Sequence, residues 1–125
     1  MAQELKVSTR QVPEATTLDL QGDLTGLADA DLMRAYHAAV ASGAANLVLN
    51  FVGTEYINSA GIGIIISLLT EARAAGVTLV ICGLSPHYQK IFRMVGLTQY
   101  AEVFETEAAA IEDLMSRGSG ASATL

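Results

Sequence analysis

Two nearly continuous apolar segments constrain the fold of this chain more than any other feature. They are "NLVLNFV" at residues 46–52 and "VTLVICGL" at residues 77–84. Neither alternates between apolar and polar residues, which is typical of strands that are covered on both faces, as in a parallel sheet. Between them, residues 60–75 carry apolar side chains at helical spacing and stop at Gly76. Strand, helix and strand at this spacing predict a βαβ unit.

The segments on either side of this unit extend the pattern. Loose alternation predicts two half-buried strands joined by a turn at Pro13 and Glu14. Ser85 is a favourable N-cap and Pro86 a favourable first residue for a helix that ends at Gly96. The expected additional elements are strands over residues 4–12, 15–22 and 99–104, and helices over residues 27–42, 86–95 and 107–117.

These elements predict one α/β domain over residues 4–117. It is a mixed sheet of about five strands, with parallel inner strands, and about four helices, in the order β-β-α-β-α-β-α-β-α. Residues 118–125, "GSGASATL", lack apolar anchors and predict a flexible tail. The length of 125 residues is sufficient for one domain with its own core.

Composition predicts a folded domain, and charge argues against a nucleic-acid partner. Apolar residues make up 51% of the chain and charged residues 16%, so a folded domain is expected. The formal net charge is −6, and the basic residues are scattered, with only Lys90 and Arg93 near each other. Nucleic-acid binding depends on clustered basic residues, so no nucleic-acid partner is predicted.

The cellular location is predicted from what the sequence lacks. Cys82 is the only cysteine, so no intramolecular disulfide can form, which suits a reducing cytoplasm. Residues 1–30 show no signal-peptide pattern. The longest apolar tract, within residues 60–69, is far shorter than the roughly 20 residues that a membrane-spanning helix needs. We expect a soluble, cytoplasmic protein without membrane insertion.

The segment "YINSAGIGIIISLL" at residues 56–69 is the main candidate site. Gly61 and Gly63 suggest a phosphate-binding loop, but Ile66 stands where a dinucleotide fingerprint needs Gly or Ala. The chain also has no Gly-Lys-Ser or Gly-Lys-Thr sequence. The standard nucleotide-binding loops are therefore not predicted.

The helix that follows has a predicted apolar face and a predicted exposed face. At about 100° per residue, Ile62, Ile65, Ile66, Leu69 and Ala72 share one face, which should pack on the sheet. Ile64 falls on the opposite side and is therefore a candidate contact point for a partner. The alternative is a single exposed apolar residue without a role, which is common.

Ser59 precedes this helix and allows two interpretations. Serine and asparagine are favoured N-caps, so Ser59 could accept a hydrogen bond from a free backbone N–H. Ser59 could also present an accessible hydroxyl, since a phosphate at a helix N-terminus is tolerated by the helix dipole. Such a phosphate would add charge beside a docking surface and change binding without changing the fold.

The remaining polar residues do not form a recognisable catalytic set. His37 and His87 lie on separate predicted helices, and neither has a second ligand at metal-like spacing. Cys82 is expected to be a small core residue. The acidic residues Glu102 and Glu105, like Glu112, are expected on the solvated surface. The sequence predicts no enzyme activity, no metal and no cofactor.

Four segments resemble the STAS domain family, in particular bacterial anti-sigma factor antagonists. They are "LQGDLTG" at residues 20–26, "LVLNFVGTEYINSAGIGIIISLL" at residues 47–69, "CGLSPHYQKIFRMVGL" at residues 82–97 and "YAEVFETEAAAI" at residues 100–111. Asn58-Ser59-Ala60-Gly61 occupies the place of the family's Asp-Ser-Ser/Thr-Gly motif. The resemblance covers residues 4–117 in the family's order.

The resemblance implies a role in partner switching. In this family the unmodified protein binds a serine kinase that is also an anti-sigma factor, of the histidine-kinase-like ATPase fold, and so frees a sigma factor. The kinase phosphorylates the serine of the motif, which abolishes binding, and a serine phosphatase reverses the modification. By position, Ser59 is the phosphorylated residue. The neighbouring partner-binding surface would consist of Asp23, Thr25, Asn58, Ala60, Gly61 and Ile64.

Two departures from the family pattern remove carboxylates. Asn58 replaces the family's Asp, and Thr25 replaces the second acidic residue of its Gly-Glu-Leu-Asp turn. These changes could alter kinase recognition or prevent phosphorylation. They favour one alternative, a STAS-like accessory subunit of a transporter or signalling assembly that is never phosphorylated. A small-nucleotide-sensing module is a second alternative.

Overall fold

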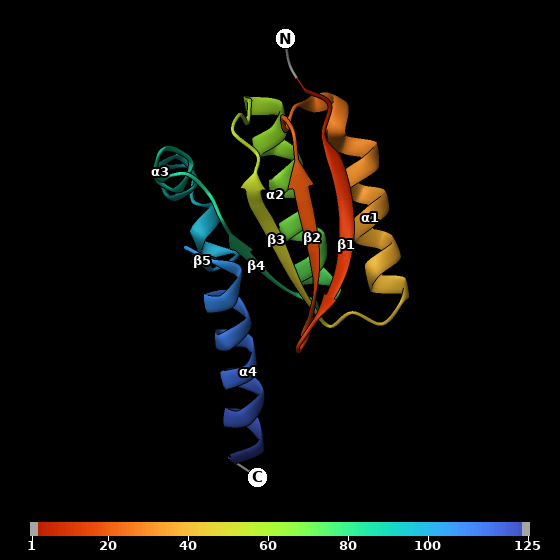
Figure 1. The fold of residues 1–125 in the computed structure, drawn as a ribbon, viewed down its shortest axis with the longest axis vertical. Helices are drawn as coiled ribbons and strands as arrows, with labels where there is room; N and C mark the ends of the chain where they lie inside the picture. Colours follow the sequence, from red (N-terminus) through yellow and green to blue (C-terminus); the bar gives the residue numbers. More distant parts are fainter. Residues whose placement is uncertain (1–2, 124–125) are drawn as a thin grey trace.

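The predicted strand–helix–strand unit forms the centre of the fold (Figure 1). The protein is described by a computed structural model over residues 3–123. The unit consists of β3 (Asn46–Gly53), α2 (Ser59–Ala74) and β4 (Thr78–Cys82). The two strands are parallel, as predicted, with Leu47 opposite Leu79. Parallel pairing across a helical connection places the start of α2 at the carboxyl end of β3.

The sheet is completed by β1 (Lys6–Val12), β2 (Ala15–Gln21) and β5 (Val103–Phe104). The described strands lie in the order β1-β2-β3-β4-β5. The β1–β2 pair is antiparallel, and the other neighbours are parallel. The predicted mixed sheet with parallel inner strands is thereby confirmed.

The last strand is shorter than the predicted residues 99–104. Gly96 adopts a left-handed conformation with φ of 85°, which turns the chain into the 3-10 helix η2 (Leu97–Gln99). Leu97 is buried there, and its carbonyl accepts a hydrogen bond from the N–H of Tyr100 at 3.0 Å. Only two residues then remain to pair with β4.

The other helices are α1 (Asp29–Ala41), α3 (Pro86–Met94) and α4 (Glu107–Ala123), with the 3-10 turn η1 (Gly26–Ala28) before α1. Ser85 caps α3 and Pro86 opens it, as predicted. Helix α4 does not end at residue 117 but continues to Ala123, into the segment predicted as a tail. Residues 124–125 of that segment lie outside the described residues, and its flexibility stays a prediction.

The two faces of the sheet carry separate cores. In β3, Leu47, Leu49 and Phe51 belong to the larger core, which also contains buried residues of α1, α2 and α3. Val48 of the same strand points to the opposite face and packs with residues of α4. This alternation follows from the two-residue period of a strand. Both faces are covered, which accounts for the nearly continuous apolar sequence of β3 and β4.

A polar cluster attaches the first turn of α4 to the sheet. The guanidinium of Arg10 on β1 contacts the carboxylates of Asp19 and of Glu107. Its Nη2 lies 2.9 Å from Asp19 Oδ1 and 2.8 Å from Glu107 Oε2. Thr17 donates its hydroxyl to Glu107 at 2.6 Å, and Asn50 donates its side-chain amide to Asp19 at 2.9 Å. The hydrogen bond from Arg10 is the largest influence on the pKa of Asp19 and lowers it. Desolvation raises this pKa and the Asn50 hydrogen bond lowers it, so that the pKa is lowered overall.

Candidate partner-binding site at the start of helix α2

Two loops meet at the carboxyl ends of β2 and β3, because these strands are parallel neighbours. The N–H of Leu24 donates to the carbonyl of Tyr56 at 2.9 Å, and the N–H of Asn58 donates to the carbonyl of Leu24 at 3.1 Å. Leu24 and Ile57 also form an isolated parallel bridge. These contacts join the loop after β2 to the segment that leads into α2. The motifs at residues 20–26 and 58–61 are thus one site.

Gly61 permits the close approach of these two loops. A Cβ atom at this position would lie 2.2 Å from the carbonyl oxygen of Leu24 and 3.0 Å from its Cγ. Both atoms belong to a fully buried residue. Gly61 is therefore a packing residue that fixes the start of α2 against Leu24, and it presents no side chain to a partner.

Asn58, and not Ser59, is the N-cap of α2. Asn58 has extended backbone angles, φ −92° and ψ 179°, and its side-chain oxygen accepts the N–H of Gly61 at 2.8 Å. The cap interpretation of Ser59 is thus wrong, because a neighbouring residue of equal capping ability occupies the cap position. Ser59 becomes the first helical residue, and it is exposed, as is Ala60. Within residues 3–123, the Ser59 hydroxyl makes no hydrogen bond.

Asp23 and Thr25 organise the adjoining loop. The carboxylate of Asp23 accepts the N–H of Gln3 at 3.0 Å, and the N–H of Asp23 donates to the carbonyl of Gln3 at 2.9 Å. Thr25 caps η1, with its hydroxyl oxygen accepting the N–H of Leu27 at 3.3 Å. Both residues are partly exposed. They can contact a partner, but each also has a structural role that the sequence did not reveal.

Ile64 is not an exposed contact point. It is only 7% exposed and belongs to the main core together with Ile65 and Leu68, so the predicted exposure is wrong. Ile66 is the isoleucine that reaches solvent, at 41% exposed, although it was expected in the core. The helix is rotated because Gly61 must face Leu24. The residues three, four, seven and eight positions later then face the core as well.

Leu27 is the most exposed of the large apolar residues described at the site, and the sequence did not single it out. Its side chain is 93% exposed. It follows Gly26, where a Cβ atom would lie 3.4 Å from the Cβ of Ala60, so the 3-10 turn is adjacent to the start of α2. The available signal was an apolar residue between a capping threonine and an acidic helix start. The site thus combines a free hydroxyl, at Ser59, with an exposed leucine.

The other residues considered for chemistry do not gather at this site. His37 on α1 contacts Glu71 of α2, with Nε2 2.7 Å from Oε1, at the helix surface. His87 is exposed and stacks edge-on against Tyr88. Cys82 is buried as predicted, and burial, with smaller effects of Glu107 and Asp19, raises the pKa of its thiol to about 12.

No group of three or more His, Cys, Asp or Glu side chains within residues 3–123 is placed to hold a metal ion. None of the helices in that range is both long enough and apolar enough to cross a bilayer. Glu102 and Glu105 are exposed, as is Glu112, in agreement with the prediction.

Comparison with known proteins agrees with this architecture. The STAS domain family model matches residues 6–110. A protein of Bordetella bronchiseptica, named "Putative anti-sigma factor antagonist BtrV", is 32% identical over 92 residues, covering 73% of this chain and 78% of that protein.

Solved structures show the same fold. An anti-sigma factor antagonist from Mycobacterium paratuberculosis superposes with a TM-score of 0.78 at 16% identity, covering 90% of this chain and 95% of the other. The Bacillus cell fate determinant SpoIIAA in its phosphorylated form gives a TM-score of 0.65 at 22% identity, covering 89% and 99%.

A five-stranded mixed sheet with the loops after β2 and β3 joined at the start of α2 defines the class of protein. This chain belongs to the STAS domain family, and within it the chain is similar to the anti-sigma factor antagonists.

Proposed function

We propose that this protein is an anti-sigma factor antagonist that is switched by phosphorylation of Ser59. In its unmodified form it would bind a serine kinase that is also an anti-sigma factor, of the histidine-kinase-like ATPase fold. Phosphorylation would release that partner, and a serine phosphatase would restore binding. We expect this exchange to take place in the cytoplasm.

The observation that carries the proposal is the free, exposed hydroxyl of Ser59 at the first position of α2. A kinase must reach this oxygen, and the cap role that would have occupied it belongs to Asn58. The position is adjacent to the exposed side chain of Leu27, which offers apolar area to a partner. Modification and docking would therefore take place on the same surface.

The physical effect of a phosphate at Ser59 favours a switch in binding over a change in fold. A phosphoserine carries about −1.5 to −2 charges at pH 7. At the N-terminus of α2 this charge is stabilised by the helix dipole and by free backbone N–H groups. The same charge lies in the middle of the docking surface, where it must be desolvated when a partner binds. The folded state tolerates the phosphate, and the complex does not.

The missing family carboxylate at residue 58 is compatible with this role. Asparagine and aspartate are nearly equivalent N-caps, so Asn58 positions Ser59 as an aspartate would. The substitution removes one negative charge beside the hydroxyl, which reduces repulsion of the γ-phosphate of ATP. The second missing carboxylate is at Thr25, where the hydroxyl caps η1 instead.

The experiment is phosphorylation of the full chain with ATP and each candidate anti-sigma kinase of the same organism, followed by mass spectrometry. Incorporation at Ser59 is expected, and none in the Ser59→Ala variant. Ser67→Ala is the matched control, because Ser67 is also exposed on α2 but lies two turns further along the helix. Modification only at Ser67 or elsewhere would contradict the proposal.

A second measurement tests the binding step. Ser59→Glu should weaken binding to the kinase by about tenfold or more, while the thermal unfolding midpoint stays nearly unchanged. Ser67→Glu should leave binding unaltered. Equal affinities of the wild type and Ser59→Glu for the kinase would refute the switch.

A further inference from the structure

The outer edge of β4 is only partly paired. On one side, β4 pairs with β3 over five residues, from Thr78 to Cys82. On the other side, β5 pairs with only Ile81 and Cys82. The first three residues of β4 therefore have no neighbouring strand on that edge, and they border a hollow of about 310 Å³.

The direction of the backbone groups along β4 follows from two observed hydrogen bonds. The N–H of Thr78 donates to the carbonyl of Ala45, on the β3 side, at 3.0 Å. The N–H of Ile81 donates to the carbonyl of Glu102, on the β5 side, at 2.9 Å. Because the direction alternates along a strand, the N–H and carbonyl of Leu79 point toward the hollow. Within the described range no protein group pairs with them on that side.

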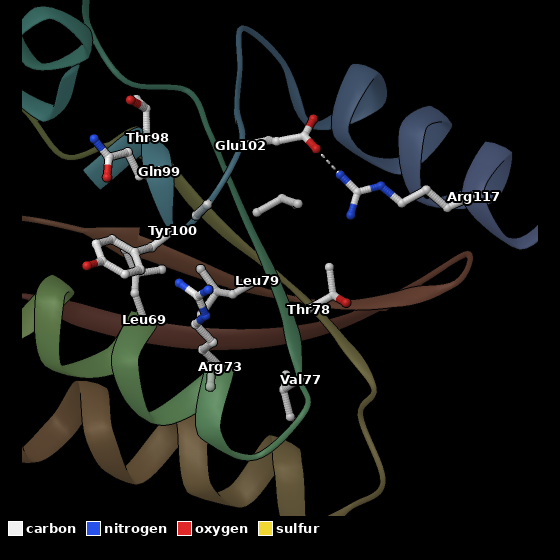
Figure 2. A pocket seen from close by; sticks show the side chains of 13 residues that line it. Leu69, Arg73, Val77, Thr78, Leu79, Thr98, Gln99, Tyr100, Glu102 and Arg117 are labelled. Carbon is white, nitrogen blue, oxygen red and sulfur yellow. Dashed lines mark hydrogen bonds and ion pairs between the residues drawn. The ribbon is translucent and has the colours of Figure 1, made fainter. Parts of the chain in front are cut away.

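Arginine side chains from two helices border this hollow (Figure 2). Arg73, in the last turn of α2, lies over the ring of Tyr100, with its guanidinium carbon 5.5 Å from the ring centre. On the other side, Arg117 of α4 pairs with Glu102 and also lies 2.8 Å from Asp113. Figure 2 shows Thr78 and Leu79 of β4 between these two groups.

The charge of the hollow is opposite to that of the whole chain. Its charged lining residues are Arg73, Arg117 and Glu102, and Glu102 is already paired with Arg117. In the part of the chain that the structure describes, Arg73 has no carboxylate partner. The hollow therefore presents one uncompensated positive charge in a protein whose net charge is −6.

We propose that this edge of β4 is a second docking site, which takes an extended acidic segment of another protein. The segment would add to the sheet beside β4 and pair with the N–H and carbonyl of Leu79. A carboxylate of the segment would pair with the guanidinium of Arg73. Strand addition of this kind combines backbone hydrogen bonds for affinity with side-chain contacts for specificity.

This site is separate from Ser59 and does not rest on the proposed switch. Ser59 and Arg73 lie at opposite ends of α2, fourteen positions apart, which corresponds to about 21 Å of helix rise. A partner at the β4 edge would leave the start of α2 accessible. The two sites could then hold two partners at once.

The test uses two end-capped fluorescent pentapeptides, Thr-Val-Glu-Val-Thr and Thr-Val-Lys-Val-Thr. Fluorescence anisotropy should show that the acidic peptide binds about fivefold more tightly, as expected for one exposed ion pair. Arg73→Gln should abolish this preference. Arg34→Gln is the matched control, because it also removes one exposed helix arginine but lies on α1, outside the hollow. Two-dimensional amide NMR spectra should place the largest shift at Leu79.

Several results would overturn the proposal. One is the absence of binding by either peptide up to about 1 mM, which corresponds to roughly −4 kcal/mol. Equal binding of the two peptides, or equal losses in Arg73→Gln and Arg34→Gln, would also do so. If inorganic phosphate alone moved the Leu79 amide to the same extent, the hollow would be an anion site. If sedimentation showed self-association that Arg73→Gln abolished, the occupant would be a second copy of this chain.

Discussion

Replacement of Gly61 by alanine tests the packing that positions Ser59. The added Cβ would lie 2.2 Å from the carbonyl oxygen and 2.9 Å from the carbonyl carbon of Leu24. These are backbone atoms of a buried residue, so they cannot move without shifting the loop after β2. The loop also accepts and donates the hydrogen bonds that join Leu24 to residues 56 and 58.

The magnitude follows from three contributions. Overpacking in a core costs about 1–3 kcal/mol, and a clash with backbone belongs at the upper end of that range. Weakening of the two loop hydrogen bonds adds about 1 kcal/mol. The higher helix propensity of alanine offsets about 1 kcal/mol. We expect Gly61→Ala to lower the free energy of unfolding by about 3 kcal/mol, which corresponds to a midpoint roughly 10 °C lower.

Gly63 is the matched control two residues further along α2. A Cβ there would meet no atom within 4 Å apart from the helix's own backbone. Gly63→Ala should therefore stabilise the protein by about 0.5–1 kcal/mol, because alanine loses less backbone entropy than glycine. Urea unfolding, with unchanged slopes, measures both variants. A loss below about 1 kcal/mol in Gly61→Ala, or equal losses in both variants, would refute the packing argument.

The remaining predictions concern the core, the polar cluster and the thiol. Ile64→Asp should lower the free energy of unfolding by about 4 kcal/mol or more, since it buries a charge in the main core. Ile66→Asp should change it by less than about 1 kcal/mol. Urea unfolding of the two variants distinguishes the observed rotation of α2 from the one that the sequence predicted. The Arg10 contact lowers the pKa of Asp19 below its ordinary value of 3.8. The contact therefore stabilises the folded protein at neutral pH, and this stabilisation is lost as the pH falls through the lowered pKa. Asp19→Asn should therefore show a shallower loss of stability in acid, measured by thermal unfolding from neutral pH downward, and an unchanged acid profile would count against the Arg10 contact. Burial raises the pKa of the Cys82 thiol to about 12, so iodoacetamide at a pH of about 8.5 should label it only in urea, and fast labelling of the native protein would disprove its burial.

The order of strands and helices could be predicted because it depends on local patterns. Strands β3 and β4 are apolar on both faces, and Ser85 with Pro86 marks a helix start regardless of its surroundings. The end of the sheet was less predictable. The strand expected over residues 99–104 is reduced to two residues because the left-handed Gly96 and the buried Leu97 form a 3-10 turn first.

The rotation of α2 could not be predicted from its own residues. The sequence Gly-Ile-Gly-Ile-Ile-Ile allows two apolar faces that share Ile65, one of which also contains Ile66 and the other Ile64. The choice between them is made by a tertiary contact, that of Gly61 with Leu24. Leu27 was missed for a related reason, because the helix expected to start there begins with a 3-10 turn that leaves its side chain in solvent.

The choice of cap at the start of α2 also comes from this contact. Asn58 and Ser59 are both favourable N-caps, so their sequence allows the helix to begin at either residue. With Gly61 fixed against Leu24, the free N–H of Gly61 lies three residues after Asn58, which is the spacing of a side-chain cap. A cap at Ser59 would require the helix to start one residue later, and the N–H of Ile62 is already bonded to the carbonyl of Asn58 at 3.0 Å. The glycine that appeared to belong to a phosphate loop is thus the residue that leaves the hydroxyl of Ser59 free.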